Sequence, residues 1–246
     1  MMFLSLSLRK NHSTNVVTSK TFSRNLLVSA ILLMTFSSCL TPKKIDSWIG
    51  SHYQDGFTPQ IKNNRSYITV KATDKIPTDG NVSTTEKGQS SMLPLLFYFQ
   101  WKYTHVSTLN EAIPLNNLGA SILAYGNSKG LQQKLNGQTL ELTVKSVPHI
   151  FSLVDKGWMV WIILGHFGME RIYLDPDKNN LVVSYRVLQG SNETKSGTIS
   201  LTNTDKAYHE KVFQSMKNMT SKYLDQYDES IKQMSQSFVD KLLLEL

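Results

Sequence analysis

The chain of 246 residues contains a single cysteine, Cys39. One cysteine excludes a disulfide within the chain and leaves no material for a thiol-based catalytic site or a cysteine-rich zinc cluster. A glycine-rich phosphate-binding loop is also absent. No basic run longer than two residues follows Cys39, so a nucleic-acid interface is not supported. The composition therefore predicts no cofactor and no nucleic-acid partner.

Acidic residues are absent before Cys39, whereas four basic residues lie there. They are Arg9, Lys10, Lys20 and Arg24. Of the 26 basic and 19 acidic residues in the chain, 22 and 19 therefore remain from Cys39 onward, so the net charge falls from +7 to +3. Residues 26–36 form an apolar run long enough to cross only about half of a bilayer core as a helix. These features are typical of an export signal and not of a permanent membrane span.

The end of this segment, Phe36-Ser37-Ser38-Cys39, resembles the lipobox of bacterial lipoproteins. The resemblance covers only the first 39 residues. It departs from the commonest pattern at Phe36, where leucine is usual, and at Ser38, where glycine or alanine is more common. It implies that residues 1–38 are a signal peptide and that Cys39 carries lipid, including acyl chains such as palmitate. The alternative is an uncleaved or conventionally cleaved segment with an incidental cysteine.

The resemblance also implies a location. A single acyl chain binds a bilayer only marginally, whereas two or three hold a protein firmly. Lipoproteins retained at the inner membrane often carry Asp after the modified cysteine, and here Leu40 stands in that place. We therefore expect a protein of the bacterial cell envelope that is anchored by an N-terminal lipid, with the outer membrane favoured over the inner.

The 208 residues from Cys39 to the end suffice for one domain with its own core. A hydrophobic content of 40% and an aromatic content of 10% favour a folded chain. Residues 39–64 are interpreted as a tether and a short segment that docks Trp48 and Ile49 on the domain. The alternative places Trp48 at the membrane interface. Residues 65–246 then form the domain.

Alternation of apolar and polar side chains with a period of two predicts strands. A first strand over 66–73 is followed by a loop over 74–91. The next strand, 93–106, places an aromatic row on one face, and core packing is favoured for this row over stacking on a ligand. Turns at 175–180 and 189–197 predict antiparallel pairing of the later strands. Those strands are 139–147, 156–174, 181–188 and 198–201.

Two segments have helical spacing. Apolar residues recur at intervals of three and four over 116–135, and close packing on a sheet would offset the cost of its three glycines. Residues 205–246 lack proline and glycine and repeat the same spacing, which predicts an amphipathic helix of up to about 60 Å unless 225–228 interrupts it. Its apolar end, 242–246, either caps the domain's own core, which is favoured, or binds an envelope protein.

The sequence Gly126-Asn127-Ser128-Lys129-Gly130 matches the nucleophile elbow of α/β-hydrolases. That motif needs a strand before Ser128 and a helix after it. The preceding residues have helical spacing, and antiparallel strands follow where alternating strands and helices are required. A serine hydrolase is therefore the weaker alternative. Candidates for its base are His149, His166 and His209.

The run 158–164 is apolar on both faces of a strand, so each face must contact something. Burial within the chain is favoured, and a lipid-like ligand or an envelope protein is the alternative. The candidate contact residues are Trp158, Met159, Trp161 and Ile163.

The order of elements predicts an α+β fold. We expect a mostly antiparallel sheet of about five or six strands, with one mid-chain helix and a long C-terminal amphipathic helix packed on one face. This order is similar to that of small α/β auxiliary domains of envelope lipoproteins, a resemblance that assigns no functional residue. The expected function is a non-enzymatic binding or assembly component. A hydrolase using Ser128 and a carrier of an apolar ligand are the alternatives.

Overall fold

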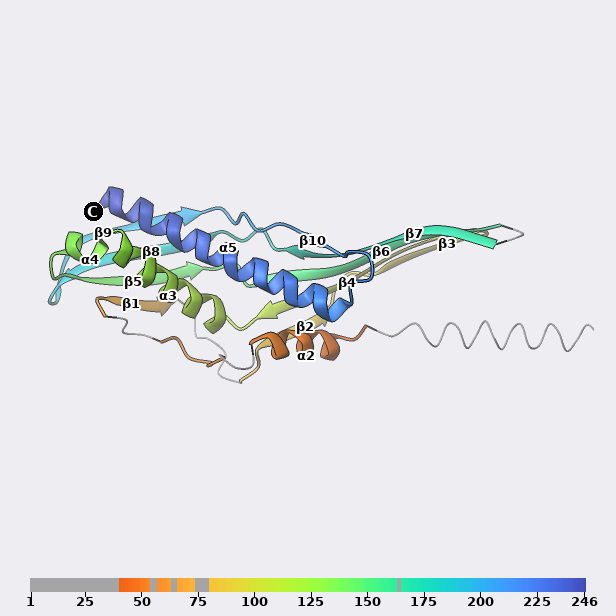
Figure 1. The fold of residues 1–246 in the computed structure, drawn as a ribbon, viewed down its shortest axis with the longest axis horizontal. Coiled ribbons are helices and arrows are strands. Elements are labelled where there is room, and N and C mark those ends of the chain that lie inside the picture. Colours follow the sequence, from red (N-terminus) through yellow and green to blue (C-terminus); the bar gives the residue numbers. More distant parts are fainter. Residues whose placement is uncertain (1–39, 54–56, 63–65, 74–79, 163–164) are drawn as a thin grey trace, which may run out of the picture. The chain divides into compact units, whose positions relative to one another are not determined.

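A computed structural model describes residues 40–53, 57–62, 66–73, 80–162 and 165–246 (Figure 1). The chain divides into two units, Met1–Leu40 and Thr41–Leu246, and every described helix and strand belongs to the second. The predicted signal peptide and Cys39 lie outside the described residues. None of the described helices is both long and apolar enough to cross a membrane.

The described part of the second unit contains ten strands and four helices, which confirms the predicted α+β class. In chain order they are α2 (Pro42–Tyr53), β1 (Ile68–Ala72), β2 (Ser83–Lys87), β3 (Ser91–Leu95), β4 (Tyr98–Leu109), α3 (Ala112–Ser128), α4 (Leu131–Leu135), β5 (Thr139–Ser146), β6 (Ile150–Ile162), β7 (Gly165–Pro176), β8 (Leu181–Gln189), β9 (Asn192–Leu201), β10 (Tyr208–His209) and α5 (Met216–Glu245).

The strands form two sheets. The first has the order β1-β5-β8-β9, and all its pairs are antiparallel except β1 with β5. The second has the order β10-β7-β6-β4-β2, with β3 also paired to β4. In this second sheet β4, β6 and β7 are the longest strands, and their antiparallel registers continue from one end to the other.

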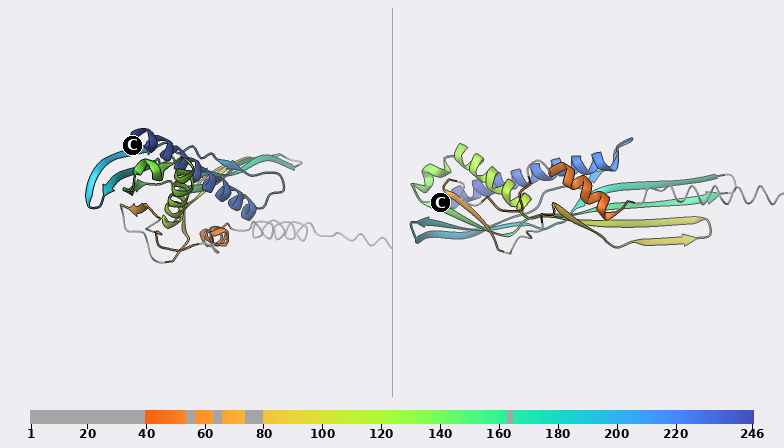
Figure 2. Two further views of the ribbon diagram at one scale, coloured as in Figure 1. Left: turned by 60° about the vertical axis from the view of Figure 1, so that its left-hand side comes forward. Right: turned by 90° about the horizontal axis from the view of Figure 1, so that it is seen from below.

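The helices lie together on the sheets (Figures 1 and 2). Helix α3 packs on α5 and β1, α2 packs on β2 and α5, and α5 also packs on β9 and β10. The ring of Phe151 in β6 lies 4.9 Å from the ring of Tyr223 in α5, centroid to centroid, and both side chains are fully buried. The long C-terminal helix is therefore packed against the sheet, as its apolar spacing predicts.

Helix α5 runs without interruption through residues 225–228, but it begins later than predicted. Ser215 caps it, because its hydroxyl accepts the backbone N–H of Asn218 at 3.3 Å. The prediction that the helix starts at 205 was wrong, since β10 and a turn occupy the intervening residues. At about 1.5 Å per residue its 30 residues span about 45 Å.

Several predicted boundaries were wrong because apolar alternation does not mark a tight turn. The predicted loop 74–91 contains β2, and residues 74–79 lie outside the described part. The predicted strand 93–106 is a hairpin, with β3 and β4 joined by a turn at Leu96 and Phe97. The predicted strand 156–174 is divided between β6, which ends at Ile162, and β7, which begins at Gly165, and residues 163–164 lie outside the described part. Most of the predicted turn 189–197 lies in β9.

The predicted helix 116–135 is also divided, into α3 and α4. Gly130, with a φ of +75°, separates them, because only glycine adopts this left-handed conformation at no steric cost. Gly126 lets the chain fold back, since a Cβ there would lie 2.8 Å from the side chain of Leu131. Its close contact is thus with the next helix and not with a sheet.

Candidate functional site

Strands β3, β4, β6 and β7 continue beyond the helices as a four-stranded extension (Figures 1 and 2). The register aligns Leu93, Gln100, Trp158 and Met169 across its four strands. The turn between β3 and β4 lies beside the end of β6, because the backbone N–H of Trp161 donates to the carbonyl of Phe97 at 2.8 Å. We call this part of the sheet the extension.

The end of the extension carries most of the exposed large apolar side chains of the described residues. Leu96 is 85% exposed and Phe97 is 60% exposed. Large contiguous apolar patches are rare on the surface of a folded protein, and where they occur they mark interaction sites. We call nine of these residues the apolar tip: Met92, Leu93, Leu95, Leu96, Phe97, Trp161, Ile162, Phe167 and Met169.

The apolar tip covers both faces of the sheet. Successive side chains of a strand point to opposite faces, and directly paired residues share a face. Trp161 therefore lies on the same face of the sheet as Phe151, which is the face toward α5. Phe167 is paired with Val160 and lies on the opposite face. Met92 belongs to the first group, and Leu93, Leu95, Ile162 and Met169 belong to the second.

Aromatic contacts order the base of the apolar tip. The Trp158 ring stacks on Tyr98 with 6.5 Å between centroids and meets the edge of Phe167 at 6.2 Å. On the other face the Trp101 indole lies against Gly157, where a Cβ would overlap its ring atoms. The Trp101 Nε1 donates to the Asp155 carboxylate at 3.1 Å. The indoles are thus held in place by their neighbours.

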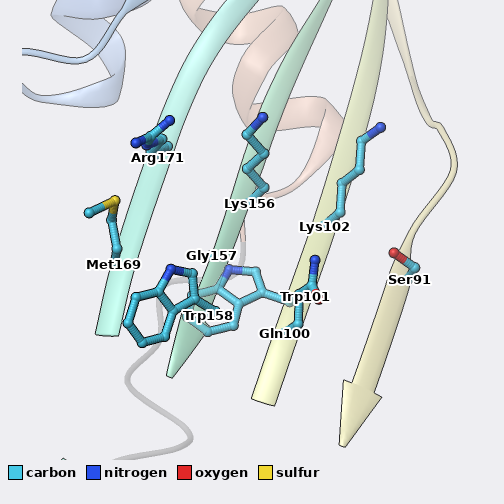
Figure 3. Close-up of a pocket in the computed structure, with 9 residues that line it drawn as sticks. All are labelled: Ser91, Gln100, Trp101, Lys102, Lys156, Gly157, Trp158, Met169 and Arg171. Carbon is cyan, nitrogen blue, oxygen red and sulfur yellow. The ribbon is translucent and has the colours of Figure 1, made fainter. Parts of the chain in front are cut away.

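Lys102, Lys156 and Arg171 stand in one row across three adjacent strands, next to Trp158 and Met169 (Figure 3). Lys102 pairs directly with Lys156, and Lys156 pairs directly with Arg171. We call these three residues the cation row. Like charges directly opposite each other destabilise a sheet. Within the described ranges, none of the three forms an ion pair, although the Lys156 ammonium lies 5.1 Å from the Tyr173 ring.

The acidic groups at this level belong to the other face of the sheet. The register places Asp155 and Glu170 on the face toward the helices. Burial raises the pKa of Glu170, and the nearby Asp155 and Glu210 raise it further. Charges of opposite sign are therefore separated by the sheet instead of being paired on one face.

An open hollow of about 450 Å³ lies over the cation row (Figure 3). Its wall combines the three cationic side chains with the apolar surfaces of Trp158 and Met169. Lysine and arginine form strong, charge-assisted hydrogen bonds with phosphate and carboxylate groups. The hollow can thus accept an anionic group whose apolar neighbour contacts the indole.

The structure places Trp158, Met159 and Trp161 in the extension, and Ile163 lies outside the described residues. Trp161 is exposed and the other two are half-buried. The favoured expectation of burial within the chain was wrong for Trp161 and Ile162, which are exposed because β6 continues beyond the helices (Figure 1). Sequence reasoning missed the cation row, since its members are distant in the chain and only the register brings them together.

The predicted hydrolase motif has the wrong local structure. Ser128 is the last residue of α3, and its hydroxyl donates to the carbonyl of Tyr125 at 2.7 Å. A helix therefore precedes the serine where the motif needs a strand. The three candidate bases lie elsewhere in the fold: between β5 and β6, in β7 and in β10. They are His149, His166 and His209.

A polar cluster that sequence reasoning missed joins α2, α3 and α5. Asp228 accepts hydrogen bonds from Tyr53 at 3.1 Å and from Asn117 at 3.0 Å. His52 lies 3.2 Å from the Ser221 hydroxyl and 3.9 Å from Asp228. These are the residue types of a catalytic triad, but the distance from His52 to Asp228 exceeds a hydrogen bond. The cluster instead ties three helices together.

Both ends of the described unit pack on it. Ile49 of α2 is fully buried and Trp48 is half-buried beside Lys44. At the C-terminus Leu242 is fully buried, and Glu245 accepts a hydrogen bond from the Tyr185 hydroxyl at 2.5 Å. In the part of the chain that the structure describes, no group of three His, Cys, Asp or Glu residues is arranged to hold a metal ion.

Comparison of the chain with protein-family models, with curated proteins and with solved structures gives no match. The features of this chain that bear on its function are therefore the extension and the N-terminal sequence.

Proposed function

We propose that the protein is a lipid-anchored, non-enzymatic binding or assembly component of the bacterial cell envelope, and that the extension is its binding surface. The observation that carries the proposal is the gathering of nine exposed apolar side chains beside a cation row that forms no ion pair with the described residues. Exposed apolar area and opposed like charges both cost stability. A binding partner that covers the extension would offset both costs.

The anchor is proposed from the sequence Phe36-Ser37-Ser38-Cys39, with the outer membrane favoured because Leu40 follows. The carrier alternative has less support, because the apolar side chains of the extension are exposed on both faces and do not line one enclosed space.

Expression of the full chain in a bacterial host with labelled palmitate tests the anchor. We expect the wild-type protein to incorporate label, to gain the mass of the acyl chains and to sediment with membranes. The Cys39→Ser variant should remain unlabelled and lose the added mass. Equal labelling of the two proteins would contradict the anchor.

Chemical crosslinking in intact envelopes tests the binding surface. We expect the double variant Leu96→Ser/Phe97→Ser to lose the crosslinked species that the wild type forms. The matched control is Val212→Ser/Leu244→Ser, since these two side chains are 84% and 87% exposed but lie outside the extension. Loss of the same species in the control would contradict the assignment of the surface.

A further inference from the structure

We infer that the apolar tip inserts into the head-group region of a bilayer that contains anionic lipids, while the cation row binds the lipid phosphates. The inference rests on the proposed function, because it assigns a partner to the surface proposed above. Four features of the extension support it: the distribution of apolar side chains, the length of the tip, the position of the charges and the edges of the sheet.

The apolar residues surround the tip. Phe167 and Met169 lie on one face, Met92 and Trp161 lie on the other, and Leu96 is at the hairpin end. A groove on a partner protein would cover one face of a sheet and leave the second in water. A bilayer covers both faces and the end together, so it matches the observed distribution better.

The length of the tip determines how the extension must be oriented at the membrane. From Lys156 to Ile162 the strand advances six residues, about 20 Å at the usual rise of an antiparallel strand. The head-group layer on each side of the hydrocarbon core is about 5–8 Å thick. The strands must therefore lie oblique to the membrane surface for the cation row to reach the phosphates while the end of the tip stays at the boundary with the acyl chains.

The order of residue types along the extension also matches a bilayer surface. Leu96, Phe97, Trp161 and Ile162 lie at the end, Tyr98 and Trp158 lie level with Phe167 and Met169, and the cation row follows. Tryptophan and tyrosine favour the interface between lipid and water, because their rings have an apolar body and a polar group. Anionic phosphates would also relieve the repulsion between Lys102, Lys156 and Arg171.

The open edges of the sheet limit the depth of insertion. In the described residues of the extension, β3 pairs only with β4, and β7 pairs with β10 only at Tyr173 and Leu174. Backbone groups without partners are too costly to place in hydrocarbon. The tip should therefore lie at the boundary of head groups and acyl chains and not span the bilayer. Edge-to-edge pairing with a second copy would also close the edges. It would, however, bring the cation rows of the two copies close to each other, where like charges repel.

A fluorescent label at the tip tests the inference in the full chain. Once Cys39 is acylated, Leu96→Cys supplies the only free thiol for an environment-sensitive fluorophore. Leu244→Cys is the control, because Leu244 is 87% exposed but lies at the end of α5. Protein purified in mild detergent is reconstituted onto vesicles of phosphatidylcholine alone, or of phosphatidylcholine and phosphatidylglycerol in equal parts.

We expect the label at Leu96 to shift to the blue on vesicles with phosphatidylglycerol, and the label at Leu244 to stay unchanged. The triple variant Lys102→Gln/Lys156→Gln/Arg171→Gln should lower the insertion equilibrium about a hundredfold at low salt. Lys145→Gln/Lys178→Gln/Lys217→Gln removes the same charge from exposed lysines outside the extension and should have no effect. Brominated lipids should quench the Leu96 label when bromine is near the head group and not when it is deep.

The failures of the two proposals can be told apart. If wild-type protein reacts with the thiol reagent and does not float with vesicles, the anchor is wrong. If the protein floats but the Leu96 label does not shift on anionic vesicles, the inference is wrong and the anchor stands. A blue shift of the Leu96 label that occurs without vesicles and grows with protein concentration would mean that the tip binds a second copy of the chain. This result would overturn the inference. Quenching only by deep bromine would overturn the proposed depth.

Discussion

Strands β4, β6 and β7 have two ends with different surroundings. At the end next to the helices, Phe151 is fully buried against Tyr223, and Asp46 accepts three hydrogen bonds from Ser83 and Thr85. At the other end Phe167 is 54% exposed, and the cation row has no ion pairs within the described residues. The same strands are therefore a core at one end and an open surface at the other.

An apolar strand pattern therefore does not by itself indicate burial. Residues of β6 are apolar near both ends, but only the end next to α5 has a helix to bury them. We expect stability to depend on the covered end and binding to depend on the extension. The following predictions test this division, and stability is measured by urea or thermal unfolding of the full chain.

The largest difference should separate two phenylalanines. Phe151→Ala should lower the free energy of unfolding by about 3–5 kcal/mol, because it leaves a cavity next to Tyr223. Phe167→Ala should change it by less than about 0.5 kcal/mol, because the ring is already exposed. Urea unfolding curves measure both values. Similar losses for the two variants would mean that the extension is covered in solution.

Removal of the Asp46 carboxylate should have the next largest effect. Asp46→Ala leaves the backbone N–H and the hydroxyl of Thr85 without this acceptor, and Thr85 is buried. We expect a loss of about 3 kcal/mol in the free energy of unfolding. Gln100→Ala, in the extension, is the control and should cost less than about 0.5 kcal/mol, since Gln100 is exposed. Equal thermal shifts would contradict the comparison.

The pH dependence of stability should differ between Glu170 and Glu193. Burial and the neighbouring Asp155 and Glu210 raise the pKa of Glu170, so the folded state binds this proton more tightly than the unfolded state. This contribution is fully present below the ordinary carboxyl pKa and is lost as the pH rises through the raised value. Glu170→Gln should therefore stabilise the protein above that range, by no more than about 0.5 kcal/mol because solvent screens the group.

Glu193 in the first sheet provides the control with the opposite sign. Hydrogen bonds from Ser196 and Arg186 lower the pKa of Glu193, so its contribution is present above the ordinary carboxyl pKa and is lost as the pH falls through the lowered value. Unfolding midpoints of Glu170→Gln and Glu193→Gln across acid pH measure both slopes. Identical slopes in the two variants would show that the carboxylates do not have these different surroundings.

The smallest effect should come from single lysines. Lys156→Gln should raise the free energy of unfolding by about 0.3 kcal/mol, because it interrupts the cation row. Lys71→Gln should lower it by about 0.5 kcal/mol, because Lys71 forms an ion pair with Glu141 at 2.7 Å. A loss of stability in Lys156→Gln would mean that the cation row has a stabilising partner.

Parts of the fold could be predicted because their patterns are local. The spacing of Tyr223, Tyr227 and Ile231 predicts one face of a helix, and these residues are buried in α5. The alternation in β5 likewise predicts its buried face at Leu140, Leu142 and Val144. Turns were harder to predict, because the apolar run continues through Leu96 and Phe97 and its one proline, Pro94, precedes the turn and is also compatible with the start of a strand.

The candidate site could be predicted only in part. The run that contains Trp158 and Trp161 was identified because it is apolar on both faces of a strand. Its exposure could not be predicted, because exposure depends on where the helices end. The cation row left no local signal, since its three members come from β4, β6 and β7.

The amino-acid sequence alone predicts the α+β class and the cores of several strands and helices, since side-chain periodicity acts between near neighbours in the chain. It also contains the lipobox-like ending at Cys39 on which the proposed anchor depends. The side-by-side position of Lys102, Lys156 and Arg171 and the exposure of an apolar sheet end become visible only in the folded chain. Both depend on strand register and helix coverage, which arise from contacts between residues far apart in the sequence.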